Sequence, residues 1–218
     1  MNTDVPLWLS LAAWALAFAA LAWASLRLPL HKLEGDGEAM RVLLVGTVLL
    51  LAMRWFNTAP LHGVSLHFLG ASIATLMFGV RFALWVMALV SLSGWAMHAV
   101  WLGWAPDFLL TGVLPVLVTA AVSRVVVRRL PHNIFIYILF NAFLAGALAM
   151  AASTLGKAVV AAFLHTGTAW AYLVATPLLM FGEAFFTGTM MALIVVYRPQ
   201  WCASFDDALY LGPPASRE

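Results

Sequence analysis

Six histidines are the side chains of this 218-residue chain with the clearest potential for chemistry. Neutral imidazole binds nickel, cobalt, copper and zinc. His62 and His67 are five residues apart, which on a regular helix places them about 140° apart around the axis. One ion can therefore contact both only if residues 60–65 form a loop that folds over the start of the next helix. The single cysteine, Cys202, excludes an intramolecular disulfide and a cluster of cysteine ligands within one chain.

The elements that must position these histidines have the composition of a membrane protein. Hydrophobic residues make up 64% of the chain and charged residues only 9%, too few polar side chains to cover a soluble fold. The charges fall mainly between long apolar runs, as in helices that cross a bilayer. This excludes soluble enzymes, nucleic-acid binders and disordered proteins, and the lipid bilayer is the expected surroundings.

Seven apolar segments predict an all-α, polytopic bundle of about seven transmembrane helices. They cover residues 7–28, 40–56, 65–78, 82–104, 106–127, 133–155 and 169–197. A tight turn is predicted at residues 79–81. No positive charge precedes the first segment and three tryptophans lie along it, so we expect a retained helix and no cleaved signal peptide. Residues 1–200 are expected to form the transmembrane domain and residues 201–218 a short cytoplasmic tail.

The distribution of lysine and arginine predicts the orientation. With the N-terminus outside and the C-terminus inside, two basic residues lie on the outer side, Arg54 and Lys157. Nine lie on the inner side: Arg27, Lys32, Arg41, Arg81, Arg124, Arg128, Arg129, Arg198 and Arg217. Cytoplasmic loops carry the excess of basic residues. This orientation places four histidines, His62, His67, His98 and His165, in the outer half of the protein.

Further donors gather on the same side, namely the terminal amine, Asp4 and Asp107. An α-amine or a deprotonated backbone amide favours square-planar Ni(II) or Cu(II). A transition-metal site near the outer face is therefore a plausible prediction. Taken singly, His62, His98 and His165 are better explained as interfacial residues that form hydrogen bonds.

One stretch resembles a known family. The sequence Gly-Val-Ser-Leu-His-Phe-Leu-Gly-Ala at residues 63–71, followed by Leu-Met-Phe-Gly at residues 76–79, resembles the substrate-binding membrane subunit of cobalt and nickel energy-coupling-factor transporters, the CbiM/NikM family. Residues 1–4, the loop after Pro106, Gly182-Glu183-Ala184 and residues 197–199 are similar to other blocks of that family, in the same order. The resemblance covers nearly the whole chain.

The resemblance implies that His67 is a metal ligand, together with the Met1 amine and the backbone amide of residue 2. That residue is Asn2, where the family has a histidine, so one imidazole is missing. Asp107 stands where the family has an asparagine, and it could orient a histidine or bind the cation directly. The implied metal set is Met1, Asn2 and His67, with His62 and Asp107 as further candidates.

The implied function is the membrane subunit of an ATP-driven importer in the bacterial cytoplasmic (inner) membrane. It would capture a divalent transition-metal ion, cobalt or nickel, with copper as an alternative, and use no organic cofactor. Gly156-Lys157 lacks the glycine and the Ser or Thr of a phosphate-binding loop. We therefore expect no enzyme activity in this chain, and expect a transmembrane coupling subunit and cytoplasmic ATPases as partners.

Two alternatives stay open. The first is a membrane metal-handling or assembly protein without transport, with copper as one candidate metal. The second is a membrane hydrolase or oxidase, which lacks support because no histidine-rich helix motif or Ser/His/Asp set occurs. A retinal photoreceptor is excluded because the last apolar segment has no lysine.

Glu183 lies near the middle of the last segment, where an ionisable group costs a few kcal/mol unless protein shelters it. We predict a protonated or hydrogen-bonded glutamate that locks helices together, with Thr187 as a candidate partner. The less favoured interpretation is a cation relay.

Overall fold

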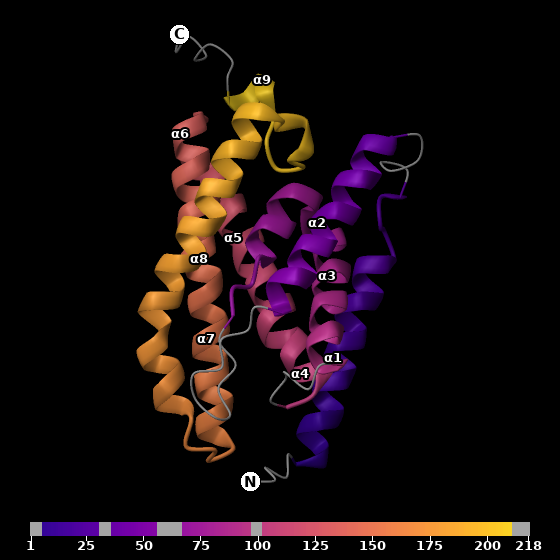
Figure 1. Ribbon diagram of the computed structural model, residues 1–218, viewed down its shortest axis with the longest axis vertical. Helices are drawn as coiled ribbons and strands as arrows, with labels where there is room; N and C mark the ends of the chain where they lie inside the picture. Colours follow the sequence, from indigo (N-terminus) through magenta and orange to yellow (C-terminus); the bar gives the residue numbers. More distant parts are fainter. Residues whose placement is uncertain (1–5, 31–35, 56–66, 97–101, 211–218) are drawn as a thin grey trace.

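The computed structural model describes residues 6–30, 36–55, 67–96 and 102–210, and these form an elongated helical bundle (Figure 1). The first three helices are α1 (Leu7–Ser25), α2 (Gly37–Trp55) and α3 (Ala71–Ala96). Two long composite helices follow: α4 (Trp104–Phe108) with η2 (Leu109–Val113) and α5 (Leu114–Arg129), and α6 (Ile134–Ile136) with η3 (Tyr137–Leu144) and α7 (Ala145–Phe163). The chain ends with α8 (Ala169–Tyr197), η4 (Pro199–Trp201) and α9 (Asp207–Tyr210). The predicted all-α fold is confirmed for these residues.

Five helical stretches of the described chain are long and apolar enough to cross a membrane. They are Leu7–Ser25, Ala71–Ala96, Trp104–Arg129, Ile134–Phe163 and Ala169–Tyr197. The protein is therefore a multi-pass membrane protein. Helix α2 has 19 residues but carries Glu38, Arg41 and Arg54. Several membrane-spanning helices are thus shown, whereas the count of about seven spans stays a prediction.

Helix α3 is two helices joined at Gly79. The backbone there has φ 79° and ψ 163°, a conformation that only glycine adopts readily. The break falls within the predicted turn at residues 79–81. Beyond α8, the N–H groups of Ala203 and Ser204 donate to the carbonyls of Met77 and Leu76, at 2.9 and 3.1 Å. The break therefore lies at the end of the bundle that carries the chain's C-terminal elements.

Several contacts define the two ends of the bundle. Arg81, beside the break in α3, donates to the carbonyl of Arg27 just after α1, and its guanidinium lies 5.3 Å from the centre of the Trp23 ring. At the other end, the Trp8 and Phe163 rings are 6.3 Å apart. The start of α1 and the end of α9 lie at opposite ends of the bundle (Figure 1).

Part of the predicted tail belongs to the packed structure. Cys202, Phe205 and Tyr210 are buried, and the Phe205 ring lies 4.9 Å from that of Tyr137. The Tyr137 and Ser204 hydroxyls are 2.6 Å apart. The first part of the expected tail, residues 202–210, therefore packs against the start of η3.

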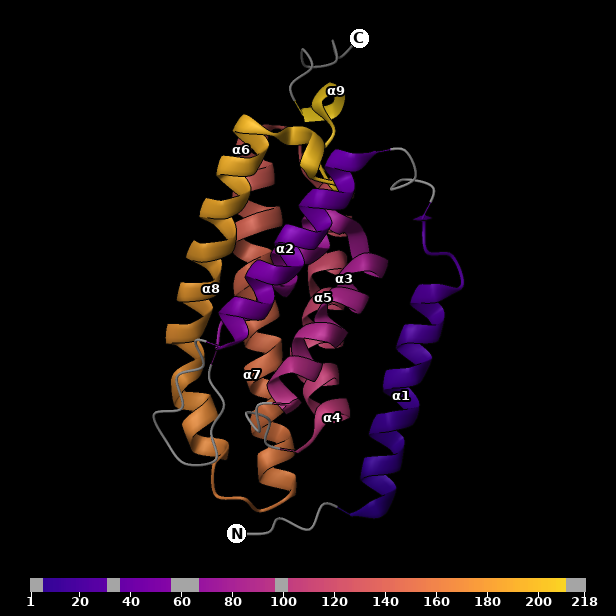
Figure 2. The same ribbon diagram turned by 45° about the vertical axis from the view of Figure 1, so that its right-hand side comes forward.

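Helices α7 and α8 pack along much of their length (Figures 1 and 2). The two helices approach closely at Gly146, where an added Cβ would lie only 3.1 to 3.2 Å from Thr187 and from the Glu183 carbonyl. Small residues at such contacts let membrane helices approach. Helix α2 instead crosses the bundle at an angle (Figure 2), and a mainly apolar groove of about 540 Å³ lies between α2, α3 and α8.

Candidate metal-binding site

His67 lies in the non-helical segment of residues 67–70 that leads into α3. Its side chain is only 6% exposed, and neither ring nitrogen has a hydrogen-bond partner among the described residues. A buried polar group without a partner costs about 1–3 kcal/mol. A ligand bound to the His67 imidazole would offset this cost. A neutral imidazole held in this way offers a nitrogen lone pair to a transition-metal ion.

The other histidines within the described ranges have different surroundings. His132 is exposed, and its Nε2 lies 3.1 Å from the carbonyl oxygen of Val127. His165 is exposed in the turn between α7 and α8, with a φ of 51°. Burial without a partner thus distinguishes His67 from both of them.

Glu183 fixes the segment that carries His67. Its side chain is wholly buried, and its two carboxylate oxygens accept the backbone N–H groups of Leu69 and Gly70, each at 2.9 Å. The prediction of a hydrogen-bonded glutamate that joins helices is confirmed. Its partners in these bonds are backbone amides just before α3, which could not be predicted from the sequence.

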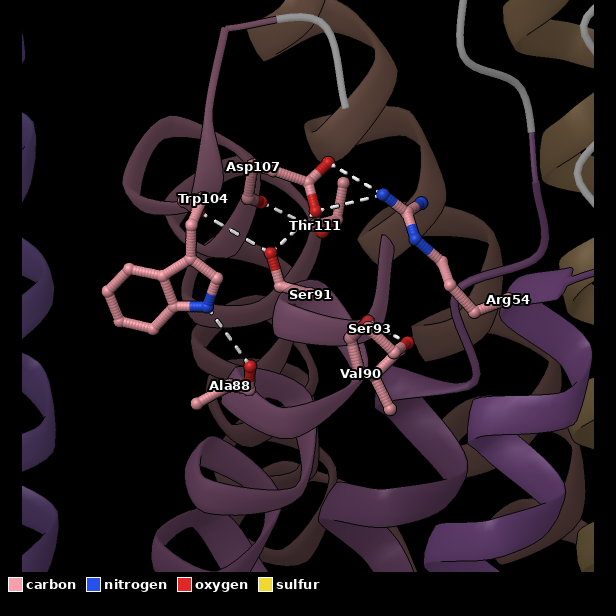
Figure 3. Close-up of polar contacts among 8 residues, drawn as sticks. All are labelled: Arg54, Ala88, Val90, Ser91, Ser93, Trp104, Asp107 and Thr111. Carbon is pink, nitrogen blue, oxygen red and sulfur yellow. Dashed lines mark hydrogen bonds and ion pairs between the residues drawn. The ribbon is translucent and has the colours of Figure 1, made fainter. Parts of the chain in front are cut away.

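Asp107 lies in a second buried polar cluster, built from α2, α3 and α4 (Figure 3). Arg54 Nη2 lies 3.0 Å from both carboxylate oxygens. The Ser91 hydroxyl donates to Oδ2 at 2.6 Å, and that of Thr111 donates to the Asp107 carbonyl at 2.8 Å. The Asp107 carboxylate is therefore already engaged by a cation and a hydroxyl.

The count of basic residues placed Arg54 and Lys157 on the outer side and gave no sign that both side chains are buried. Their exposed fractions are 3% and 6%. Lys157 Nζ lies 6.0 Å from the centre of the Tyr172 ring. The sequence carried no signal for the ion pair, because an arginine near the end of an apolar run can instead extend its side chain to the membrane interface.

A family comparison decides the protein's class. The model of the CbiM family, described as the cobalt uptake substrate-specific transmembrane region, matches residues 2–201. The chain belongs to the CbiM family. No curated protein and no solved structure matched the chain.

Membership of the CbiM family confirms the resemblance carried by residues 63–71 and 182–184. It makes the chain a membrane component of cobalt uptake, with cobalt as the transported substrate. Cobalt is one of the ions that imidazole binds. The unpartnered nitrogens of His67 and the family's substrate thus agree in their chemistry.

The other predicted ligands are distributed as follows. Met1, Asn2 and His62 lie outside the described residues, as do Asp4 and His98. Within the described part of this CbiM chain, no three His, Cys, Asp or Glu side chains come together as a metal site. The structure thus places one predicted ligand, His67, in a suitable environment, and gives Asp107 a cationic partner. The complete ligand set stays a prediction.

Proposed function

We propose that this CbiM chain is the substrate-binding membrane subunit of an energy-coupling-factor importer, and that it captures Co(II) or Ni(II) on the outer face. The observation that carries the proposal is the buried His67 imidazole, whose two nitrogens have no protein partner among the described residues. Family membership supplies the link to cobalt uptake.

The proposed ligands are His67, the Met1 amine and the backbone amide of Asn2, with His62 as a further donor. Asp107 could bind the ion directly only by giving up its contacts with Arg54 and Ser91. Its pairing therefore favours an indirect electrostatic role. Because Asn2 supplies no imidazole, the affinities of the site for nickel, cobalt and copper must be compared directly.

The proposed orientation has the N-terminus outside and the C-terminus inside the bacterial cytoplasmic membrane. It rests on the excess of basic residues in the predicted inner loops. The proposed partners are a transmembrane coupling subunit and cytoplasmic ATPases, since the chain has no phosphate-binding loop of its own. Transport without enzyme activity is thus the role proposed for this chain.

The test is equilibrium binding of Co(II), Ni(II), Cu(II) and Zn(II) to the purified protein with a native N-terminus. We expect His67→Ala to abolish high-affinity binding, because it removes a ligand from the site. His132→Ala is the matched control, since that imidazole is exposed at a loop and should leave the affinity unchanged. If His67→Ala binds every ion as tightly as the parent, the proposed site is wrong.

Asn2 keeps a second function open, that of a metal-handling protein that does not transport. Reconstitution in liposomes separates the two functions. With the coupling subunit and ATPases present, we expect Co(II) accumulation that requires ATP. Binding without accumulation in the complete complex would favour the second function, and ATP-independent accumulation by this chain alone would contradict the importer assignment.

A further inference from the structure

We propose that Glu183 is the positioning residue of the metal site, which holds the backbone after His67 so that the imidazole faces the ion. This inference rests on the proposed function of His67. Glu183 itself does not ligate the ion in this proposal. It acts through the segment of residues 67–70, which it connects to α8.

The hydrogen bonds give Glu183 control over both the position and the rotation of this segment. One carboxylate oxygen accepts the N–H of Leu69 and the other accepts that of Gly70, each at 2.9 Å. The carbonyl of Gly70 accepts the N–H of Ala74 at 3.0 Å, so the carboxylate sits at the N-terminal end of α3. A negative charge is stabilised there by the helix dipole and by free N–H groups. This explains how a carboxylate can be wholly buried in the bundle.

Neighbouring residues of α8 extend the contact to Phe68, which follows His67 directly. Gly182 has no side chain, and the Phe68 ring occupies the space, so that a Cβ at residue 182 would lie 2.7 Å from Phe68 Cε1. One turn later, the Phe186 ring lies 6.2 Å from that of Phe68. A single turn of α8 therefore holds residues 68, 69 and 70.

The opposite side of the segment is closed by α2. Leu50 packs directly against Gly70, and a Cβ at residue 70 would collide with the leucine side chain. Because neither nitrogen of His67 has a hydrogen-bond partner among the described residues, the ring is oriented by the backbone and packing around it. The geometry offered to a metal ion therefore depends on the contacts of α8 with residues 68–70.

The test compares Co(II) affinity and the visible spectrum of the Co(II)-bound protein in the parent, Glu183→Gln and Glu183→Asp. Glutamine replaces one accepting oxygen with an NH₂ group that faces a backbone N–H, and aspartate is too short to keep both bonds. We expect about 10- to 100-fold weaker binding, the usual effect of losing a group that orients a ligand, together with a shifted spectrum. Thr176→Val is the matched control, because Thr176 is a buried residue of the same helix that donates to Thr154 at 3.0 Å.

Gly182→Ala keeps the inference testable if the Glu183 variants fail to fold. It removes no polar group and favours helix formation, yet its methyl group must displace Phe68. We expect a folded protein with weakened Co(II) binding and an altered spectrum. Folding of each variant is checked by its elution as a single species and by its thermal transition.

The outcomes separate the two proposals. Loss of binding in His67→Ala, with weakened binding in Gly182→Ala and in the Glu183 variants that fold, and parental binding in Thr176→Val, supports the positioning role. Loss in His67→Ala with parental affinity and spectrum in folded Glu183→Gln or Gly182→Ala overturns it and leaves the proposed function intact. Parental binding in His67→Ala overturns the proposed function itself.

Discussion

Two buried polar features of this protein contrast at the residue scale, an ion pair and an imidazole. Arg54 and Asp107 form an ion pair with exposed side-chain fractions of 2% and 7%, while the nitrogens of His67 have no partner in the part of the chain that the structure describes. The Arg54 guanidinium packs closely against Gly94, where an added Cβ would lie 2.5 Å from Arg54 Nε. A paired charge serves the fold, whereas an unpaired imidazole is available for binding.

The ion pair predicts an unequal response to single and double substitution. Asp107→Ala should destabilise the protein by about 3–5 kcal/mol, because it leaves the Arg54 guanidinium buried without its counter-charge. The double variant Arg54→Met with Asp107→Leu should recover much of this loss, since it removes both charges. Denaturant unfolding in detergent micelles measures the effect. A double variant that is less stable than Asp107→Ala would contradict this account.

At the scale of elements, α2 contributes two buried side chains, both near its end. Only Leu50 and Arg54 of this helix are buried, the first against Gly70 and the second against Asp107. Other residues of α2, between Glu38 and Met53, line the apolar groove between α2, α3 and α8. The placement of α2 and that of the segment behind His67 are therefore coupled through Gly70.

Gly70→Ala tests this coupling. Gly70 has a φ of 62°, and an added methyl group would also collide with Leu50, so we expect a loss of stability of about 2 kcal/mol or more. Gly167→Ala is the control, because Gly167 has a φ of 77° with open space around it, and its cost should be about 1–2 kcal/mol from backbone strain alone. Thermal unfolding and Co(II) affinity are measured together. Equal costs, with unchanged Co(II) affinity in Gly70→Ala, would show that the contact with Leu50 has no role.

At the scale of the whole molecule, the two ends of the bundle differ in charge. Arg27, Arg81 and Arg198 lie near the end that carries α9. The turn between α7 and α8, with His165, lies at the opposite end (Figure 1). By the distribution of basic residues, the arginine-rich end faces the cytoplasm in the proposed orientation.

Labelling of engineered cysteines with a membrane-impermeant maleimide tests this orientation. His165→Cys should react in intact cells, and His132→Cys should react only after permeabilisation, because these exposed positions lie in the turns at opposite ends of the bundle. Burial raises the pKa of the native Cys202 to about 12, so its thiol stays protonated at neutral pH and reacts slowly. The reverse labelling pattern would place the site of His67 on the cytoplasmic side.

The sequence by itself determined the local features of this protein. Apolar runs predicted the membrane helices because the bilayer requires a continuous hydrophobic stretch of about 20 residues. Gly79 marked the break in α3 because its conformation depends on a single residue. His67 was identified from the short motif around it, which is also local.

Only the tertiary structure decided which buried groups meet. Arg54 and Asp107 are 53 residues apart, and Glu183 is 114 residues from Leu69, so no spacing rule could pair them. The sequence showed that Glu183 needed shelter from lipid, because an isolated charge among apolar helices is costly. The partner's identity depended on how the helices pack, which brings a carboxylate of α8 to the backbone that carries His67.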